Sequence, residues 1–290
     1  MDYSYTREEL FFLMVHDSDG FNRWNAAQLL AIDIMNELQQ SDTAEVPVLL
    51  VNAFEGVLNS SSDADVDKAM IAHLLGLPTE GFLIEQSVVA DVDAIHRIRE
   101  KTANGLAGML KDSFAKVYEA TSTAEAYKTD ASSVAKRALK NMALAYLVRT
   151  GEVEWVECCF KQFTDASNMT DQMAALRCLV SNDTARGQEL GENALNSFYE
   201  QWQHEPLVVD QWFAVQATFQ LPDTLNKVIE LLDHEAFEIR NPNKVRSLIG
   251  AFCGQNHIGF HNANGEGYEF LADRILELDQ LNPQIAARLL

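Results

Sequence analysis

The sequence predicts an all-α protein, arranged as an irregular HEAT-like or armadillo-like superhelix, an α-solenoid. Apolar residues recur at spacings of three and four along almost the whole chain, and the polar stretches between these segments are short. No stretch alternates strictly between apolar and polar residues as a half-buried strand does. Helices joined by short loops pack as antiparallel neighbours, and each pair leaves an apolar face that the next pair covers. We favour this array over a compact bundle and expect residues 1–290 to form a single helical domain.

The N-terminal segment shows the pattern most clearly. Thr6-x-x-Glu9 is a capping box that predicts the start of a helix. A turn is expected at residues 17–20, and the next helix should bury one stripe of five apolar residues: Trp24, Ala27, Ala31, Ile34 and Leu38. The same reasoning predicts helices over residues 66–75, 92–120, 133–149 and 152–163, with later segments over 190–202, 208–219 and 225–232.

Composition and charge exclude several classes of protein. With 47% hydrophobic and 22% charged residues the chain has an ordinary globular composition. Its 43 acidic and 22 basic residues give a formal net charge of -21, which repels a phosphate backbone, so we expect no nucleic-acid partner. The longest apolar stretch, residues 142–148, is too short for a bilayer, and the start Met1-Asp2-Tyr3-Ser4 lacks a basic region followed by an apolar run. We therefore expect no membrane partner and a cytoplasmic location.

Motifs that carry metal chemistry are incomplete in this chain. H-E-x-x-H places two histidines on one helix face, but after His204-Glu205 and His234-Glu235 the second histidine is replaced by Val208 and Glu238. Asp63-x-Asp65-x-Asp67 begins like a calcium loop, but Lys68 replaces its glycine and Leu74 its last glutamate. We interpret that segment as a solvated helix start.

Other sources of chemistry are missing from the pattern as well. The four cysteines (Cys158, Cys159, Cys178 and Cys253) form no C-x-x-C pair, and we expect buried free thiols. No phosphate loop, dinucleotide fingerprint or nucleophile elbow occurs. The sequence therefore predicts no catalytic residue, no metal site and no cofactor in this chain.

Two Asn-Pro dipeptides at predicted helix starts are the strongest candidates for a binding site. Asn241-Pro242 places an N-cap before a proline at the first helical position, with Arg246 one turn further, and Asn282-Pro283 repeats the arrangement before Arg288. A helix N-terminus beside an arginine is a plausible binding corner for a carboxylate. A well-capped helix with a surface arginine is the alternative, and spacing alone favours it.

Several segments, in order along the whole chain, carry a family resemblance. They are Phe21-Asn22-Arg23-Trp24-Asn25-Ala26-Ala27-Gln28, Asn168-Met169-Thr170-Asp171, Asp210-Gln211-Trp212-Phe213, Asn241-Pro242-Asn243-Lys244-Val245-Arg246 and Asn282-Pro283-Gln284-Ile285-Ala286. Together they resemble the C-terminal helical domain of the bacterial aminopeptidase N family, the alanyl aminopeptidases of the zinc gluzincin class. In that family a separate thermolysin-like domain carries the zinc ligands and a G-A-M-E-N motif.

The resemblance implies a role in substrate binding without a catalytic centre. It implies that Arg246, Gln284 and Arg288 line a cavity over the active site of the parent enzyme and face the downstream part of the peptide. It also implies that the partners are peptide substrates and the catalytic domain of the same parent chain, where zinc would be held. Because the chain stops at Leu290, inside a predicted helix, we expect a fragment trimmed before the native C-terminus.

The leading hypothesis is thus the cap domain of a cytoplasmic zinc aminopeptidase, inactive by itself, that controls access to the active site. The alternative is a stand-alone α-solenoid scaffold that holds a protein partner. The natural reading frame distinguishes them, because an aminopeptidase frame continues upstream into H-E-x-x-H.

Overall fold

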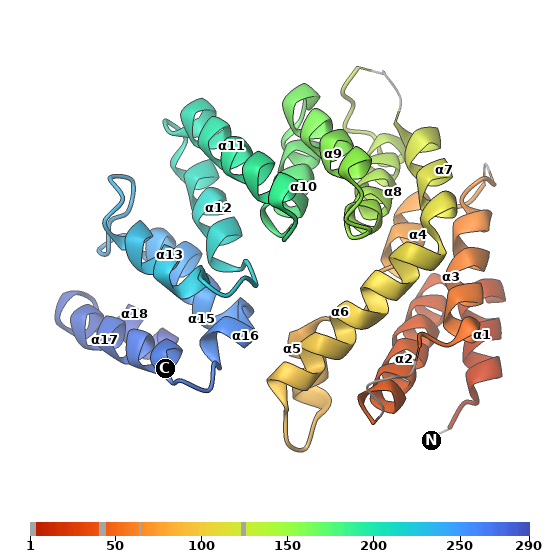
Figure 1. Cartoon of the computed structure of the whole chain (residues 1–290), viewed down its shortest axis with the longest axis horizontal. Helices are drawn as coiled ribbons and strands as arrows, with labels where there is room; N and C mark the ends of the chain where they lie inside the picture. The colour runs from red at the N-terminus through yellow and green to blue at the C-terminus, as the bar shows by residue number, and fades with distance from the viewer. Residues whose placement is uncertain (1–3, 41–44, 64, 123–125) are drawn as a thin grey trace. The chain divides into compact units, whose positions relative to one another are not determined.

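The computed structural model describes residues 4–40, 45–63, 65–122 and 126–290, and these residues form helices without a strand (Figure 1). The start of the chain that lacks a signal-sequence pattern falls mostly outside these ranges, at residues 1–3, as does residue 64 of the calcium-loop lookalike. The chain divides into two compact units, Met1–Cys178 and Leu179–Leu290. The single-domain organisation stays a prediction. Within the described ranges, no helix has the length and apolar character needed to cross a bilayer.

The helices of the two units follow one another closely along the chain. The first unit contains α1 (Arg7–His16), α2 (Gly20–Gln39), α3 (Val48–Ser60), α4 (Lys68–Leu74), α5 (Glu80–Gln86), α6 (Val92–Met109), α7 (Lys111–Thr121), α8 (Ala131–Val148), α9 (Val153–Asp165) and most of α10 (Met169–Val180). The second contains α11 (Ala185–Trp202), α12 (Pro206–Ala217), α13 (Thr224–Leu232), α14 (Pro242–Val245), η1 (Arg246–Gly250), α15 (Ala251–Gln255), α16 (His257–Phe260), α17 (Glu266–Leu281) and α18 (Pro283–Leu289).

Short polar side chains start many of these helices. The predicted capping box is confirmed, because the Glu9 N–H donates to Thr6 Oγ1 at 3.2 Å and the Thr6 N–H donates to Glu9 Oε2 at 2.8 Å. Asp67, from the calcium-loop lookalike, caps α4 by accepting the Ala69 N–H at 2.8 Å, which confirms the solvated helix start. The expected turn between α8 and α9 contains Gly151 at φ 72°, a left-handed conformation that favours glycine.

The long helix predicted over residues 92–120 is wrong, because the structure divides it into α6 and α7 at Leu110, which has φ -111° and ψ 17°. Leu110 is buried, its N–H still donates to the Leu106 carbonyl at 3.0 Å, and its carbonyl accepts the Phe114 N–H at 2.9 Å. Hydrophobic periodicity and most backbone bonds therefore continue through the bend, so spacing alone does not reveal it.

The stripe predicted for α2 is confirmed at four positions and wrong at the fifth. Ala27, Ala31, Ile34 and Leu38 are buried, but Trp24 is 38% exposed. Spacing identifies which face of a helix turns inward, but it does not say how far along the helix the neighbouring elements cover that face.

Aromatic side chains fix the centre of the first unit, where α7 packs against α8 and α3 against α7 (Figure 1). The ring of Phe114 stacks on Tyr146 with centroids 4.4 Å apart, and Phe54 meets Tyr146 edge-on at 6.3 Å. The Tyr146 hydroxyl donates to the Leu75 carbonyl at 2.8 Å, at the end of α4. One buried tyrosine thus connects four helices.

Replacing Phe114 with alanine is expected to lower the free energy of unfolding by about 3–5 kcal/mol, because the ring is fully buried and leaves a cavity. Phe12→Ala is the matched control: Phe12 is 60% exposed, and its loss should change stability by less than about 0.5 kcal/mol. Urea unfolding followed by circular dichroism measures both. Equal losses in the two variants would contradict this description of the core.

A partly buried ion pair joins the start of α5 to α6. His96 Nδ1 lies 2.8 Å from Glu80 Oε1, and the two side chains are 20% and 7% exposed. The hydrogen bond with Glu80 raises the pKa of His96, and desolvation opposes it; Glu100 also raises this pKa, while Arg99 lowers it. The folded state therefore binds the His96 proton more tightly than the unfolded chain does.

We expect this pair to stabilise the protein in mildly acidic solution. Its contribution is fully present below the unfolded histidine pKa of about 6.5 and is lost as the pH rises through the higher folded pKa. The difference in unfolding free energy between wild type and His96→Gln should therefore be larger at about pH 5.5 than at about pH 8.5. A difference that grows with rising pH would show the opposite sign and contradict the assignment.

Candidate functional site

The first Asn-Pro corner forms as predicted. The Asn241 side chain accepts the Asn243 N–H at 3.0 Å, and Pro242 occupies the first position of α14. Proline at that position loses no intrahelical hydrogen bond and is already restrained to a helical φ. The corner is therefore locally determined by its own sequence.

Arg246 begins a π-helical segment directly after this corner. η1 runs from Arg246 to Gly250 between α14 and α15, and π-helical turns occur frequently at functional sites. The Arg246 side chain is exposed, and its one hydrogen bond to another described residue runs from Nη1 to Asn243 Oδ1 at 2.8 Å. That bond holds the guanidinium beside the corner while solvent still reaches it.

Lys244, between the corner and Arg246, is buried and structural. Its Nζ lies 2.9 Å from Asp210 Oδ1 on α12, donates to the Pro206 carbonyl at 3.2 Å and sits 5.4 Å from the Phe213 ring centroid. Periodicity and motif searches did not single out this ion pair. Its only sequence signal was that both residues belong to the segments that carry the family resemblance.

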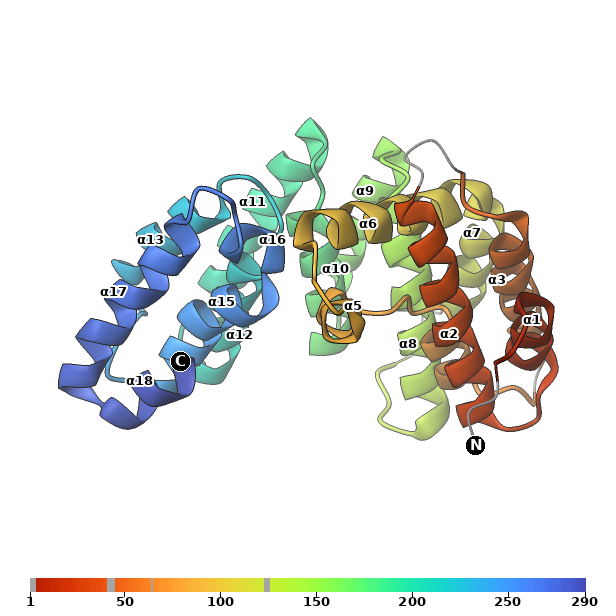
Figure 2. The same cartoon turned by 90° about the horizontal axis from the view of Figure 1, so that it is seen from below.

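The second corner differs from the prediction in one respect. Pro283 begins α18 as expected, but the Asn282 side chain makes no capping hydrogen bond, so the expectation that Asn282 repeats Asn241 is wrong. The Asn282 backbone makes the connection itself: its N–H donates to the Leu278 carbonyl at 2.6 Å, and its carbonyl accepts the Ala286 N–H at 3.2 Å. α17 thus leads directly into α18, which packs beside it (Figure 2).

Gln284 and Arg288 lie one turn apart on α18, and both are exposed. The opposite face of the helix buries Ile285 and Ala286. This helix therefore presents its two candidate binding residues to solvent and uses its apolar residues for packing.

The two corners belong to neighbouring elements. A methyl group added at Gly250 would lie 3.8 Å from the Leu289 side chain and 4.0 Å from Cβ of Arg246. The end of α18 therefore approaches η1, and Arg246 and Arg288 stand on adjoining helices of the second unit. Their role in substrate binding stays a prediction.

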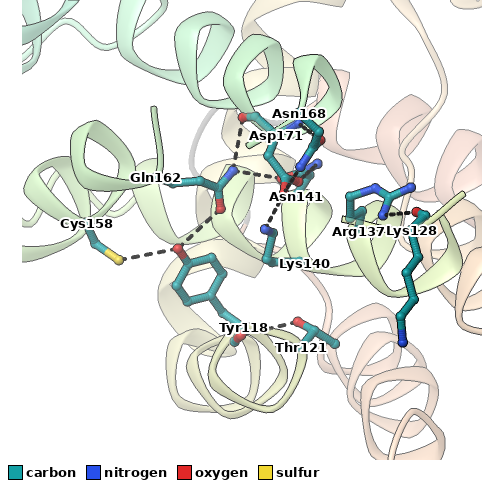
Figure 3. Close-up of polar contacts among 10 residues, drawn as sticks. All are labelled: Tyr118, Thr121, Lys128, Arg137, Lys140, Asn141, Cys158, Gln162, Asn168 and Asp171. Carbon is teal, nitrogen blue, oxygen red and sulfur yellow. Dashed lines mark hydrogen bonds and ion pairs between the residues drawn. The ribbon is translucent and has the colours of Figure 1, made fainter. Parts of the chain in front are cut away.

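A separate polar cluster, in the first unit, is built around Asp171 (Figure 3). Asp171 is paired with Lys140 at 2.6 Å and accepts 3.0 Å bonds from Asn141 and Asn168. Gln162 extends the cluster by donating to Asn141 Oδ1 at 2.8 Å. Because these groups satisfy one another and lie in or near the interior, we interpret the cluster as a structural connection among α8, α9 and α10.

Tyr118 lies at the edge of this cluster and serves as a hydrogen-bond donor. Its hydroxyl donates to Gln162 Oε1 at 3.2 Å and lies 3.6 Å from Cys158 Sγ. Burial raises the pKa of Tyr118 well above its usual range, and the neighbouring Cys158 thiol adds to this shift. Tyr118 therefore keeps its proton and acts as a hydrogen-bond donor.

His234, from the second His-Glu pair, has a packing role, whereas His204 and Glu205 of the first pair are exposed. His234 lies among aromatic rings, with centroids 4.9 Å from Tyr199 and 5.0 Å from Trp212, and burial lowers its pKa. Glu205 is the N-cap residue of α12. Across the part of the chain that the structure describes, no three His, Cys, Asp or Glu side chains come together to hold a metal ion.

Taken together, these features define a helical-repeat domain with an exposed basic corner and without a metal-ligand cluster in the described residues. A family model described as "Domain of unknown function (DUF3458_C) ARM repeats" matches residues 7–290, and the chain belongs to this family. The predicted armadillo-like helical fold is thereby confirmed.

Relatives and a solved structure carry aminopeptidase names. The chain is 37% identical over 295 residues to aminopeptidase N of Escherichia coli K12 and 35% identical over 294 residues to that of Haemophilus influenzae. Each match covers 100% of this chain and 33% of the relative. A crystal structure of Legionella pneumophila aminopeptidase A in complex with aspartic acid matches 100% of this chain with TM-score 0.89 and 32% identity, over 34% of its own chain. The resemblance to aminopeptidase N is confirmed, and the chain spans about a third of the length of these relatives.

Removing one partner of the buried Lys244–Asp210 ion pair should destabilise the second unit. Asp210→Ala leaves the Lys244 ammonium without its counter-charge, and we expect a loss of about 3–5 kcal/mol in unfolding free energy. The control Arg246→Ala removes an exposed side chain and should change stability by less than about 0.5 kcal/mol. Chemical unfolding measures both variants, and an Asp210→Ala protein as stable as wild type would contradict a structural role for the pair.

Proposed function

We propose that this chain is the C-terminal helical domain of a longer zinc aminopeptidase, an enzyme that removes N-terminal residues from peptides. The observation that carries the proposal is that relatives named aminopeptidase N match the whole chain, while the chain matches only 33% of each. The peptidase chemistry belongs to the remaining part of the parent polypeptide in this proposal.

The proposed role of the domain is to close over the active site, control access and bind the downstream part of the peptide. Arg246, Gln284 and Arg288 are the proposed contacts. Their solvent exposure and the adjoining positions of η1 and α18 support this role. A guanidinium group binds a carboxylate through charge-assisted hydrogen bonds, and closure of a lid keeps water and unsuitable substrates from the reacting groups.

Zinc is assigned to the parent's catalytic domain, because the described residues of this chain do not fit it. Three protein ligands are usual at a catalytic zinc, and no such group forms in the described ranges. We also propose a cytoplasmic location. The four free cysteines support this location, because structural disulfides are rare in a reducing compartment.

The natural reading frame and the purified parent protein test the proposal. We expect the frame to continue upstream into H-E-x-x-H and G-x-M-E-N, and we expect the parent to hydrolyse an N-terminal alanine amide until a chelator removes its metal. A frame that encodes only a helical scaffold would instead support the stand-alone alternative.

Within the active parent, Arg246→Gln with Arg288→Gln should raise KM roughly ten-fold for a short peptide with a free C-terminal carboxylate, because two solvent-exposed ion pairs worth about 0.7 kcal/mol each are lost. The same peptide with an amidated C-terminus should bind wild type and variant almost equally. Steady-state kinetics measures both. The exposed Arg240→Gln is the matched control, and a KM equal to that of wild type in the double variant would contradict carboxylate binding.

A further inference from the structure

We infer that a surface of the first unit is the face on which the peptidase part of the parent polypeptide docks. This surface, the aromatic face, consists of Phe21, Trp24 and Phe82 and the cavity beside them, and the cavity accepts one bulky apolar side chain of that partner. The inference rests on the proposed function, because it takes the chain to be part of a longer aminopeptidase.

The cavity has a volume of about 340 Å³ and lies among α2, α5, α8 and the segment that ends α4. Its walls are mostly apolar, with Gln28, His73 and Thr79 as the polar side chains. A cavity of this volume accommodates an aromatic or large aliphatic side chain, and side chains buried in such pockets dominate the affinity of many interfaces.

Three aromatic residues stand exposed at or near this cavity. Phe21 is 68% exposed, Trp24 38% and Phe82 39%, and the ring centroids of Phe21 and Trp24 are 6.1 Å apart. Trp24 and Phe82 belong to the cavity wall. Phe21, Trp24 and Gln28 fall three and four residues apart, on one face of α2. Single exposed apolar residues are ordinary, but a group of aromatic residues beside a cavity is typical of an interaction site.

The wall of the cavity is held in place before any partner arrives. Gln28 Nε2 donates to the Gly76 carbonyl at 2.9 Å, and Arg99 Nε donates to the Pro78 carbonyl at 2.8 Å. Thr79 Oγ1 accepts the Phe82 N–H at 3.2 Å and caps α5. The segment between α4 and α5 is thus tied to α2 and α6, so docking requires little ordering of this wall.

The length of the relatives indicates which partner docks on the aromatic face. Each match covers the whole of this chain but only 33% of the aminopeptidase N, so about two thirds of such a parent lies outside this chain. A partner on the same polypeptide has a high effective concentration, and a small apolar face is then sufficient for docking. A second copy of this chain is a less favourable occupant, because two chains that each carry a net charge of -21 repel one another.

Hydroxyl-radical labelling of the intact parent protein tests the inference at the side chains. Phe21 and Phe12 have nearly equal exposed fractions here, 68% and 60%, and the same intrinsic reactivity. We expect Phe21 to be labelled several-fold more slowly than Phe12, which is the internal reference. Trp24 should likewise be labelled several-fold more slowly than its 38% exposed fraction predicts. Phe21 labelled as fast as Phe12 would overturn the docking face.

A variant of the intact parent provides the second measurement. Phe21→Ser with Trp24→Ser should loosen the junction, so that limited proteolysis between the two parts becomes several-fold faster, and the matched control Phe12→Ser should behave like wild type. Proteolysis unchanged in the double variant would contradict the inference. Protection of Phe21 that appears only at high protein concentration would indicate a second copy as the occupant and would also overturn it.

The outcomes separate this inference from the function on which it rests. A reading frame without an upstream peptidase, or a parent without metal-dependent aminopeptidase activity, refutes the proposed function. An active aminopeptidase whose Phe21 and Trp24 are labelled freely refutes the docking face alone.

Discussion

The buried ion pair between Lys244 and Asp210 is the constraint on which the candidate site depends. It connects the short helix α14 to α12, and its 2.9 Å separation requires the Lys244 side chain to turn into the second unit. Side chains two residues apart on a helix point about 200° apart. Once Lys244 faces inward, Arg246 must face solvent, which is where the structure places it. The buried Lys244 side chain thus determines that the Arg246 side chain points towards solvent.

The first unit uses a similar arrangement at a different place. Lys140 and Asp171 form a partly buried ion pair there, and amide groups of Asn141 and Asn168 also donate to the carboxylate. Displacement of a buried charge from its partner is strongly unfavourable, because the charge is then left without compensation in the interior. Buried or partly buried ion pairs therefore help to fix the positions of neighbouring helices in both units.

Local sequence signals predicted the helices and the first corner, because caps and periodicity depend on residues a few positions apart. The start of α1 is determined by Thr6 and Glu9, and the start of α14 by Asn241 and Pro242. Features that arise from distant residues were not predictable in this way. The bend at Leu110 preserves the apolar spacing, the exposure of Trp24 depends on what other elements leave uncovered, and Lys244 meets a partner that is 34 residues away in the sequence. The Asn-Pro helix starts drew attention to Arg246 and Arg288, and the resemblance added Gln284 and the predicted binding role. The structure adds the exposure of these three residues and the adjoining helices that carry them.

The acidic net charge of the chain makes Arg246 and Arg288 important for any binding of an anionic group. A domain with 43 acidic and 22 basic residues repels an anionic group at long range, so a peptide carboxylate gains little from the overall field. Attraction must then come from guanidinium groups within a few ångströms, where direct hydrogen bonds outweigh the distant repulsion. Salt screens the long-range repulsion more than it weakens a close hydrogen-bonded pair. The proposed carboxylate binding therefore depends on the local guanidinium groups and not on the overall charge of the domain.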